Sequence, residues 1–478
     1  MTDEVHEAPM ARSLSRRRFL AGLVVAPSAG AFLAACSSSS SPSPPIATSP
    51  STSAFPIGAA SRATSKPVSI TVWHSMTSNN LTTLQSLTES FQRSQSDVTV
   101  NLVNQDDYTD TMTLYTESLS GGPFPDVVQI ESSDLQLMVD SQSVVPAAAA
   151  VAADRYSLSD FLPSTVDYFR TGQTLWAMPF NISSQILFYD QNAFSKAGLD
   201  PSIPPATLDD VRTAAQKIVS SGTEKYGLSF KTTPSNFEQW MALGDKLLVN
   251  NDNGRSARAT AVAFNNSFGQ SLFTWISELF DHHLAQPTSP TTYDNLIGIA
   301  NRIAPMTLET SGALGTVVSL LNAGQYSDVK LGVGPLPRPT GGTGGVFVGG
   351  AGLYMIKRSP PERQDAAWQY IKYLVGAAQQ AQWAVGTGFI PIRKSAVTQP
   401  VLVDAWQKMP YFRVAYDQVL GSPANPASAG AVCGAQAQVD NAIQSAMSQL
   451  AEGVAPGTAL HDAAATANQA IASYNSRV

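Results

Sequence analysis

The spacing of apolar residues changes twice between Val68 and Leu102. Residues 68–73 alternate between apolar and polar, as in a half-buried strand. Residues 81–91 carry apolar side chains at the spacing of one helix face, and residues 98–102 alternate again. A strand, a helix and a second strand in succession are typical of a parallel β-α-β unit. The sequence therefore predicts an α/β fold with a largely parallel sheet.

Later segments extend this pattern. Residues 126–130 predict another buried strand, and residues 175–180 predict an extended segment near a crossing between two lobes. Helical spacing of apolar side chains recurs in residues 367–375 and 439–450. A glycine-rich stretch, residues 340–352, separates two strand-like segments. We interpret this stretch as a functional loop.

The N-terminal region has the features of an export signal. Residues 15–20 read Ser-Arg-Arg-Arg-Phe-Leu, and an apolar stretch follows that ends in Leu-Ala-Ala-Cys at Cys36. This pattern predicts a twin-arginine lipoprotein signal peptide (residues 1–35) with lipid attached to Cys36. Residues 36–66 are rich in Ser and Pro and predict a flexible tether. Residues 67–478 remain as the folded domain.

Composition narrows the function and the architecture. The chain has 478 residues, more than the ~250 to 300 residues that one core supports, so two lobes are expected. Its net charge of −7 and the lack of a basic run beyond the predicted signal peptide exclude nucleic acid as an expected partner. Of the two cysteines, Cys36 is predicted to carry lipid, so Cys433 is expected to be a buried apolar side chain.

Catalytic motifs are missing from the sequence. The five histidines make no metal-binding spacing, and no G-x-S-x-G segment is present. The glycine-rich stretch lacks the Lys-Ser/Thr pair of a nucleotide-binding loop. We therefore expect no catalytic residues, metal or cofactor. A lipid-anchored glycoside hydrolase stays open as an alternative, because paired carboxylates converge only in three dimensions. A receptor without a transport role is the other alternative.

Several longer sequence segments, taken together, indicate a resemblance to a known protein family. They are Trp-His-Ser-Met at 73–76, Pro-Phe-Asn-Ile-Ser-Ser at 179–184, Ala-Gly-Leu-Asp-Pro at 197–201, Gly-Gly-Ala-Gly-Leu at 349–353 and Thr-Gly-Phe-Ile-Pro-Ile at 387–392. With them, the chain resembles the extracellular solute-binding proteins of carbohydrate-type ABC importers, most strongly the glycerol-3-phosphate and glycerophosphodiester-binding branch. The similarity runs in order from residue 70 to residue 472.

The resemblance implies a two-lobed periplasmic-binding-protein fold of type II, with lobes joined by crossing hinge strands. We expect lobe 1 to contain about residues 67–180 and 306–348, and lobe 2 about residues 181–305 and 349–478. The ligand would be enclosed between the lobes.

The same resemblance implies the ligand-binding positions. Physically, a cleft for hydroxylated ligands needs aromatic faces and a few fixed hydrogen-bonding groups, including a carboxylate. Glu131 follows a predicted buried strand, which is where α/β sheets bind ligands. Ser184 is an alternative to Ser183, because the two are adjacent. The candidate residues are Tyr108, Glu131, Ser183, Trp240, Thr310, Gly350, Phe389 and Gln436.

Some of these positions depart from the family pattern. Phe389 replaces a Tyr and loses its hydroxyl, and Gln436 falls near the Arg that grips phosphate in the family. Lys231 and Arg338 stay open as replacements for that Arg from elsewhere in the fold. We therefore expect a neutral or zwitterionic ligand, such as a glycerophosphodiester, a polyol or a short saccharide, more than glycerol-3-phosphate.

The resemblance also implies partners and location. A permease pair driven by a cytoplasmic ATPase would receive the ligand. The protein would act as a monomer, lipid-anchored to the outer face of the cell membrane.

Overall fold

The computed structural model describes residues 55–60, 67–324 and 328–478. The predicted signal peptide and the acylation site Cys36 lie outside these ranges, as does most of the predicted tether. In the described ranges, no helix is both long enough and apolar enough to cross a membrane.

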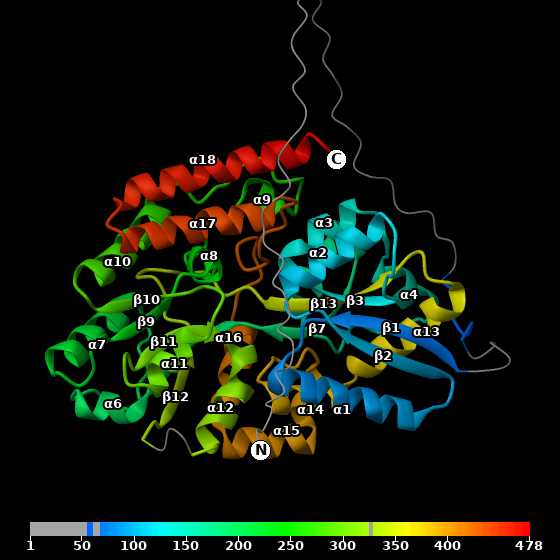
Figure 1. Ribbon diagram of the computed structural model, residues 1–478, viewed down its shortest axis with the longest axis horizontal. Coiled ribbons are helices and arrows are strands. Elements are labelled where there is room, and N and C mark those ends of the chain that lie inside the picture. Colours follow the sequence, from blue (N-terminus) through cyan, green and yellow to red (C-terminus); the bar gives the residue numbers. More distant parts are fainter. Residues whose placement is uncertain (1–54, 61–66, 325–327) are drawn as a thin grey trace, which may run out of the picture. The chain divides into compact units, whose positions relative to one another are not determined.

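The first sheet forms the core of one lobe, at the right of Figure 1. Its strand order is β2-β1-β3-β13-β4, and β7 also pairs with β13. β1, β2 and β3 are parallel, whereas β13 runs antiparallel to β3 and β7. The strands are β1 (Val68–His74), β2 (Val98–Asn104), β3 (Val127–Glu131), β4 (Val144–Val145), β7 (Met178–Ser183) and β13 (Gly349–Ile356).

The second sheet forms the core of the other lobe, with the order β10-β9-β11-β8-β12. β8 runs antiparallel to both of its neighbours. The strands are β8 (Gln185–Asp190), β9 (Leu228–Lys231), β10 (Ala285–Thr288), β11 (Met306–Thr310) and β12 (Leu331–Pro335). A separate hairpin pairs β5 (Arg170–Thr171) with β6 (Thr174–Leu175). Two sheets of mixed direction, each with its helices, confirm the predicted α/β class.

Amphipathic helices cover the first sheet. In α1, the buried side chains include Leu84, Leu87 and Phe91, which are the residues whose spacing predicted this helix. The helices of this lobe are α1 (Ser78–Ser94), α2 (Tyr108–Leu119), α3 (Leu135–Asp140), α4 (Ala147–Ala153), α5 (Pro163–Tyr168), α13 (Pro361–Leu374), α14 (Ala377–Thr387) and α15 (Pro400–Lys408).

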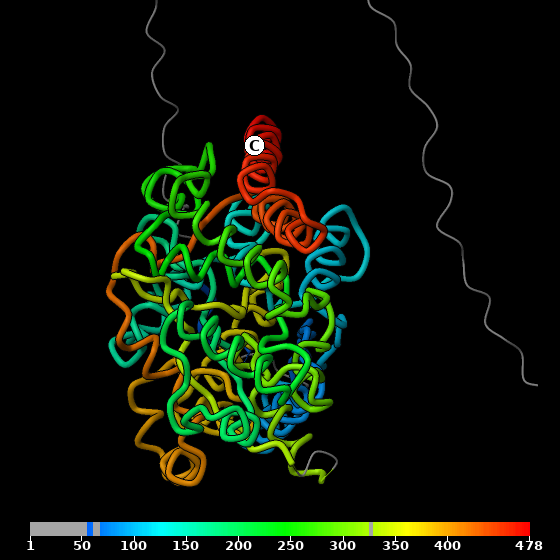
Figure 2. Tube along the Cα trace, turned by 90° about the vertical axis from the view of Figure 1, so that its left-hand side faces the viewer, coloured from blue at the N-terminus to red at the C-terminus, as the bar shows by residue number. Residues whose placement is uncertain are grey.

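The second lobe includes the C-terminal pair of helices, which lie side by side in Figures 1 and 2. Its α7 begins with a capping box, in which Thr207 accepts from the Asp210 N–H and Asp210 reciprocates. The helices are α6 (Gln191–Lys196), α7 (Leu208–Ser220), α8 (Pro234–Leu243), α9 (Asn250–Gly254), α10 (Ser267–Asp281), α11 (Asp294–Ala300), α16 (Val414–Leu420), α17 (Gln436–Ala451) and α18 (Pro456–Asn475). The remaining helix, α12 (Leu314–Asn322), follows β11 but packs on α1 and α14 of the first lobe.

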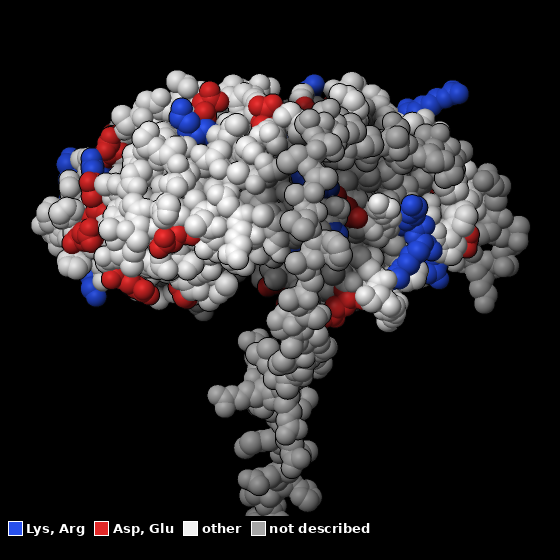
Figure 3. Space-filling view, turned by 90° about the horizontal axis from the view of Figure 1, so that it is seen from above, with Lys and Arg blue, Asp and Glu red and all other residues white. Residues whose placement is uncertain are grey.

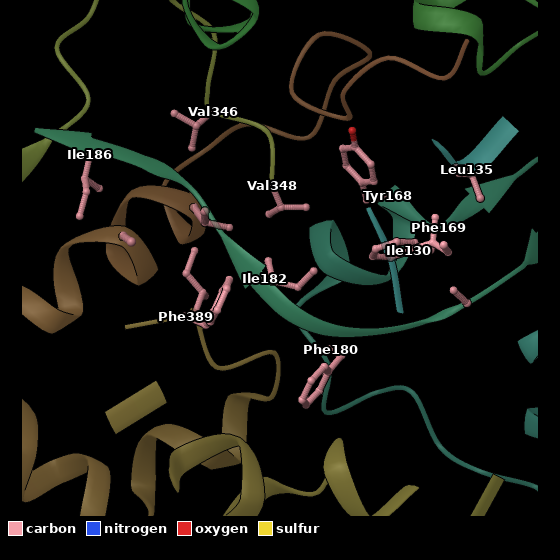
Figure 4. Packing of buried hydrophobic residues seen from close by; sticks show 14 of the residues in the cluster. Ile130, Leu135, Tyr168, Phe169, Phe180, Ile182, Ile186, Val346, Val348 and Phe389 are labelled. Carbon is pink, nitrogen blue, oxygen red and sulfur yellow. The ribbon is translucent and has the colours of Figure 1, made fainter. Parts of the chain in front are cut away.

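The chain crosses between the sheets at Ser184. This single residue separates β7 of the first sheet from β8 of the second. Figure 4 shows the crossing, with Phe180, Ile182 and Ile186 along it and Phe389 beside it. All residues of β7 and β8 are buried, which explains their nearly continuous apolar sequence. The predicted hinge crossing is present.

Strand pairing reverses part of the predicted lobe assignment. We expected residues 306–348 in lobe 1, but β11 and β12 belong to the second sheet. We expected residues 349–478 in lobe 2, but β13 belongs to the first sheet. The physical reason is strand pairing: β11 and β12 flank β8, and β13 inserts between β3 and β7. Such pairings are non-local and leave no mark in local apolar spacing.

Residues 55–60 of the predicted tether pack on the folded domain. Phe55 is buried, and the backbone N–H groups of Gly58 and Ala60 donate to the Asp365 carboxylate at 3.0 and 2.9 Å. Asp365 lies on α13 and is itself buried. Residues 55–60 are therefore part of the folded unit, in contrast to the flexible tether predicted for residues 36–66.

Charged side chains are scattered on the face shown in Figure 3. Lysines, arginines and acids lie singly or in small groups of mixed sign among uncharged residues. This visible surface offers no continuous basic patch for a phosphate backbone.

Candidate ligand-binding site

Tyr108 and Glu131 come together at the carboxyl edge of the first sheet. Glu131 is the last residue of β3, and Tyr108 is the first residue of the helix that follows β2. Because β1, β2 and β3 are parallel, their carboxyl ends meet at one edge. The Glu131 charge contributes to raising the pKa of the Tyr108 phenol, after burial as the larger cause. The sequence predicted the strand-end position of Glu131, and the family resemblance named Tyr108 as a candidate.

A buried polar network orients the Tyr108 phenol. Asn181 Nδ2 donates to the Tyr108 hydroxyl at 2.7 Å, and Gln129 Nε2 donates to Asn181 Oδ1 at 2.7 Å. The Ser75 N–H donates to Gln129 Oε1 at 2.9 Å and completes the network. Because Asn181 is the donor, the phenol proton stays available for an acceptor on a ligand. Tyr293, before α11 of the second lobe, also raises the pKa of Tyr108 and so lies near it.

Sequence reasoning missed Asn181 and Gln129. Each is a polar residue within a strand whose other residues are almost all apolar and buried. A buried amide needs hydrogen-bonding partners, so its presence in such a strand was an available signal for a polar network.

Glu131 is half-buried among other acids. Burial is the largest cause that raises its pKa to about 8, followed by the nearby charges of Asp134 and Asp440, against a lowering hydrogen bond from Ser133. The pKa of Asp134 is raised to about 6 by burial. In the ligand-free protein, the Glu131 carboxyl therefore carries a proton through most of the neutral range.

Gln436 lies at the start of α17 between two further acids. Its Nε2 donates to Glu238 Oε1 at 3.0 Å and to Asp440 Oδ1 at 2.7 Å. Burial raises the pKa of Glu238 to about 7 and that of Asp440 well above its usual range. The two carboxyls also hydrogen-bond to each other, so they share a proton. Glu131, Asp134, Glu238 and Asp440 are called the acid cluster below.

A cavity opens beside the acid cluster, between elements of both lobes. It encloses about 350 Å³ of empty space, including space open to solvent. Tyr168 and Phe347 line it with rings stacked at a centroid distance of 6.3 Å. Figure 4 shows Tyr168 near Val348 and Leu135. Its other lining residues are Ser133, Glu238, Ala242, Lys246, Leu248, Asn253, Ala427, Gly430, Ala431 and Gln436.

The structure distinguishes the two adjacent serines at the crossing. The Ser184 hydroxyl accepts from Gln418 Nε2 at 2.9 Å, and the Ser184 carbonyl accepts from the Ser311 N–H. Ser183 is the last residue of β7, beside Gly349. No hydrogen bond to its hydroxyl is found among the described residues. Ser183 is the one of the two whose hydroxyl remains available.

Gly350 has a structural reason to be glycine. Its φ is +99°, and a Cβ at this position would lie 1.9 Å from the Asn181 carbonyl oxygen. The close approach is between β13 and β7 and involves no ligand. Gly350 nevertheless lies beside the Tyr108–Asn181 network, because it pairs with Ile182.

Thr310 and Phe389 lie on either side of Gly312. Thr310 ends β11, and its hydroxyl caps the following turn by accepting from the Gly312 N–H at 3.3 Å. A Cβ on Gly312 would lie 2.7 Å from the Phe389 ring. This ring stacks on Trp383 at 5.6 Å and is 7% exposed. Phe389 packs at the crossing, and only a small edge of its ring reaches the surface.

Trp240 lies in the core of the second lobe instead of on a cleft surface. It is 0% exposed, its ring contacts Phe230 and Trp275, and its Nε1 donates to the Pro337 carbonyl at 3.2 Å. The stacking face that we expected for a ligand is covered by protein. Helical spacing alone does not separate a core aromatic residue from one that faces a cleft.

The two cations considered as phosphate ligands are both engaged. Lys231 Nζ forms a buried ion pair with Glu309 Oε2 at 2.8 Å, and Asn295 Nδ2 donates to the same oxygen at 3.2 Å. Arg338 donates to the Gly344 carbonyl. Neither residue lines the cavity.

Features of a catalytic centre are sparse in the described residues. No group of three His, Cys, Asp or Glu side chains there is arranged to hold a metal ion. His74 is buried, and burial lowers its pKa to about 4. Cys433 is buried with a pKa raised by burial to about 11, which fits the expected apolar role.

A family model described as bacterial extracellular solute-binding protein matches residues 86–411. The chain belongs to this family. The match confirms the resemblance given by the sequence phrases, and it confirms the prediction of a binding protein without catalytic activity. It also agrees with a protein that works outside the cytoplasm.

Curated relatives cover most of the chain. The sn-glycerol-3-phosphate-binding periplasmic protein UgpB of Brucella melitensis is 26% identical over 364 residues, which is 75% of this chain and 82% of the relative. UgpB of Escherichia coli is 25% identical over 403 residues, which is 81% of this chain and 89% of the relative.

Solved structures share the fold. The GacH receptor of Streptomyces glaucescens, studied unliganded and with acarbose, has a TM-score of 0.71 at 21% identity and covers 86% of this chain and 100% of its own. UgpB of Mycobacterium tuberculosis in complex with glycerophosphocholine has a TM-score of 0.70 at 17% identity and covers 85% of this chain and 98% of its own. These similarities confirm the two-lobed periplasmic-binding-protein fold.

Proposed function

We propose that this protein is the lipid-anchored receptor of an ABC importer and captures a hydroxylated small molecule between its lobes. Family membership supports the transport role, and the convergence of Tyr108, Glu131 and Gln436 at the inter-lobe edge carries the binding site. A phenol donor, a carboxyl group and an amide are the groups that recognise ligand hydroxyls. The ligand bridges the lobes, so its greater affinity for the closed form drives closure. The permease then receives the closed, liganded form.

The ligand class follows from the charges of the site. The relatives named for glycerol-3-phosphate and the structure titled with glycerophosphocholine support glycerophospho compounds, whereas other structural neighbours are titled with saccharides such as maltose. A phosphomonoester carries two negative charges, whereas the cavity is lined by Glu238 and one exposed lysine, with the rest of the acid cluster beside it. We therefore favour a short saccharide, a polyol or a glycerophosphodiester over glycerol-3-phosphate.

Calorimetric titration of the purified protein tests this proposal. The ligands are maltose, trehalose, glycerol, glycerophosphocholine and glycerol-3-phosphate. We expect binding of at least one of the first four, and a loss of at least about tenfold in affinity for Glu131→Ala, because a hydrogen bond to a charged group contributes ~1.5 to 3 kcal/mol. Glu452→Ala, an exposed acid after the end of α17, is the matched control and keeps full affinity. Unchanged affinity in Glu131→Ala would remove this residue from the site.

Lipid anchoring at Cys36 is part of the proposal and rests on the Leu-Ala-Ala-Cys sequence. Cys36→Ser removes the thiol that accepts the lipid. We expect the wild-type protein in the membrane fraction and the variant in the soluble fraction or unprocessed. Membrane association of a fully processed Cys36→Ser protein would contradict acylation as the anchor.

A further inference from the structure

The acid cluster has no positive partner in the described part of the chain. No ion pair there joins Glu131, Asp134, Glu238 or Asp440 to a Lys, Arg or His side chain. The four side chains are half-buried, and each raises the pKa of at least one other member. Gathering like charges in a partly desolvated place is costly unless a cation or protons compensate them.

The side-chain oxygen of Gln436 independently indicates that the site lacks a hydrogen-bond donor. The residue is 4% exposed and lines the cavity, and its amide nitrogen is used by two members of the cluster. Its Oε1 is buried without any hydrogen-bonding partner. A buried acceptor left open costs about 1 to 3 kcal/mol, so a ligand that donates to it gains that interaction. The open group is an acceptor, as are the ionised carboxylates beside it.

The nearby basic groups do not supply the missing positive charge or the missing hydrogen-bond donor. Arg255 is buried with its pKa lowered by burial, and it donates to the backbone carbonyls of Gly430 and Ala429, with further bonds to residues 167, 168 and 170. Lys246 is exposed where it lines the cavity. Arg255 lies 5.2 Å from the Tyr168 ring centroid, so it occupies a face of that ring and leaves Phe347 as the aromatic surface toward the cavity.

The lining of the cavity favours an organic cation over a metal ion. No three carboxylates among the described residues converge as metal ligands, and the Phe347 ring is part of the lining. An alkylated or protonated amine is bulky, donates hydrogen bonds or packs on aromatic rings, and gains energy from diffuse negative charge.

We propose that the cavity beside the start of α17 binds a positively charged nitrogen of the transported ligand, held by the acid cluster and Gln436 against the Phe347 ring. This inference rests on the proposed function, because it specifies the ligand of the same receptor. The ammonium group can belong to an aminosugar or to the head group of a glycerophosphodiester. In both, hydroxyls remain for Tyr108 and Glu131.

Matched ligand pairs test the inference by calorimetry on the purified protein. Glucosamine disaccharide is compared with cellobiose, and glycerophosphocholine with glycerophosphoglycerol. We expect the member with the positively charged nitrogen in one pair to bind about tenfold to a hundredfold more tightly, the equivalent of ~1.5 to 3 kcal/mol. The pair that shows the preference identifies the source of the nitrogen. Equal affinities within the pair that binds would overturn this inference and leave the proposed function standing. Binding of no member, nor of any ligand in the earlier panel, would count against both.

Two variants test whether the acid cluster causes the preference for a ligand with a positively charged nitrogen. Glu238→Gln and Asp440→Asn keep the side-chain shape and remove a charge, so each should reduce the preference for the ligand with the positively charged nitrogen at least about fivefold. Glu224→Gln is the matched control: this buried carboxyl also has a pKa raised to about 7, but it faces Asp190, Arg302 and Lys196 and does not line the cavity. A preference that survives in both cluster variants, with thermal melts showing that they fold, would overturn the assignment.

The pH profile gives a second readout with glycerophosphocholine, whose charge is fixed. The titratable and charged groups at or beside the cavity are the acid cluster, Tyr168, Lys246 and Arg255. Cation binding requires ionised carboxyls, so affinity should rise several-fold from pH 6 to pH 8 with release of protons. The rise should shrink in Glu238→Gln and persist in Glu224→Gln. Affinity that is flat with pH in the wild type would contradict the role of the cluster.

Discussion

At the scale of single residues, the site is defined by the hydrogen-bonding groups that remain unpaired on each side chain. Tyr108 receives a hydrogen bond from Asn181 and keeps its own proton, whereas Gln436 gives its amide protons to Glu238 and Asp440 and keeps an open oxygen. The open group at Gln436 is an acceptor, and under our proposal it favours a ligand that donates hydrogen bonds.

Gly350 gives a prediction at this scale. Gly350→Ala places a Cβ at a positive φ and 1.9 Å from the Asn181 oxygen, so the β13–β7 pairing must shift. We expect a loss of roughly 2 to 5 kcal/mol in unfolding free energy, from overpacking and backbone strain together. Urea denaturation measures this loss. Gly349→Ala is the control, because its nearest neighbouring atom would be 3.8 Å away, and it should change stability by less than about 1 kcal/mol. Similar stabilities of the two variants would refute the close approach.

At the scale of elements, the crossing strands decide where the site lies. β7 and β8 are separated by one residue but belong to different sheets, and β13 returns to the first sheet beside β7. The strand ends that carry Glu131, Ser183 and Thr310 therefore lie close to the crossing. The start of α17 adds Gln436 from the second lobe, because α17 packs on α8 and contacts the turn after β3. Four segments far apart in sequence thus contribute to one site.

At the scale of the whole molecule, the raised pKa values make the ligand-free fold sensitive to pH. Glu131, with a pKa of about 8, and Glu238 and Glu224, with pKa values of about 7, bind protons more tightly in the folded than in the unfolded chain. Below the unfolded pKa, about 4.5, their contribution is fully favourable, and it is lost as the pH rises through the folded pKa. Burial of the carboxyls at the ligand site therefore costs stability at alkaline pH.

Stability should consequently fall between pH 6.5 and pH 8. Measurements start at pH 6.5 because His74, with its pKa lowered to about 4, destabilises the fold only as the pH falls below its unfolded pKa. We expect the unfolding free energy to decrease by roughly 1 to 2 kcal/mol across this window, as measured by urea denaturation. The Glu131→Gln/Glu238→Gln double variant should show a flatter profile. A wild-type profile that rises with pH would contradict proton uptake by these carboxyls.

The sequence by itself determined the α/β class, the first strands and helices, and the family. These depend on local apolar spacing and on short phrases such as the Pro-Phe-Asn segment of β7, which are read without long-range information. It also placed Glu131 at the end of a buried strand, whereas Tyr108 was a candidate only through the family resemblance.

Only the tertiary structure decided the lobe that β11, β12 and β13 join, the burial of Trp240 and the docking of residues 55–60. Each depends on pairing or packing between segments that are distant in sequence, and local spacing is the same in either arrangement. The acid cluster also depends on packing between segments that are distant in sequence. The sequence did not single out Glu238 or Asp440, and their interaction with Glu131 arises when β3, α8 and α17 meet and exclude water from the charges.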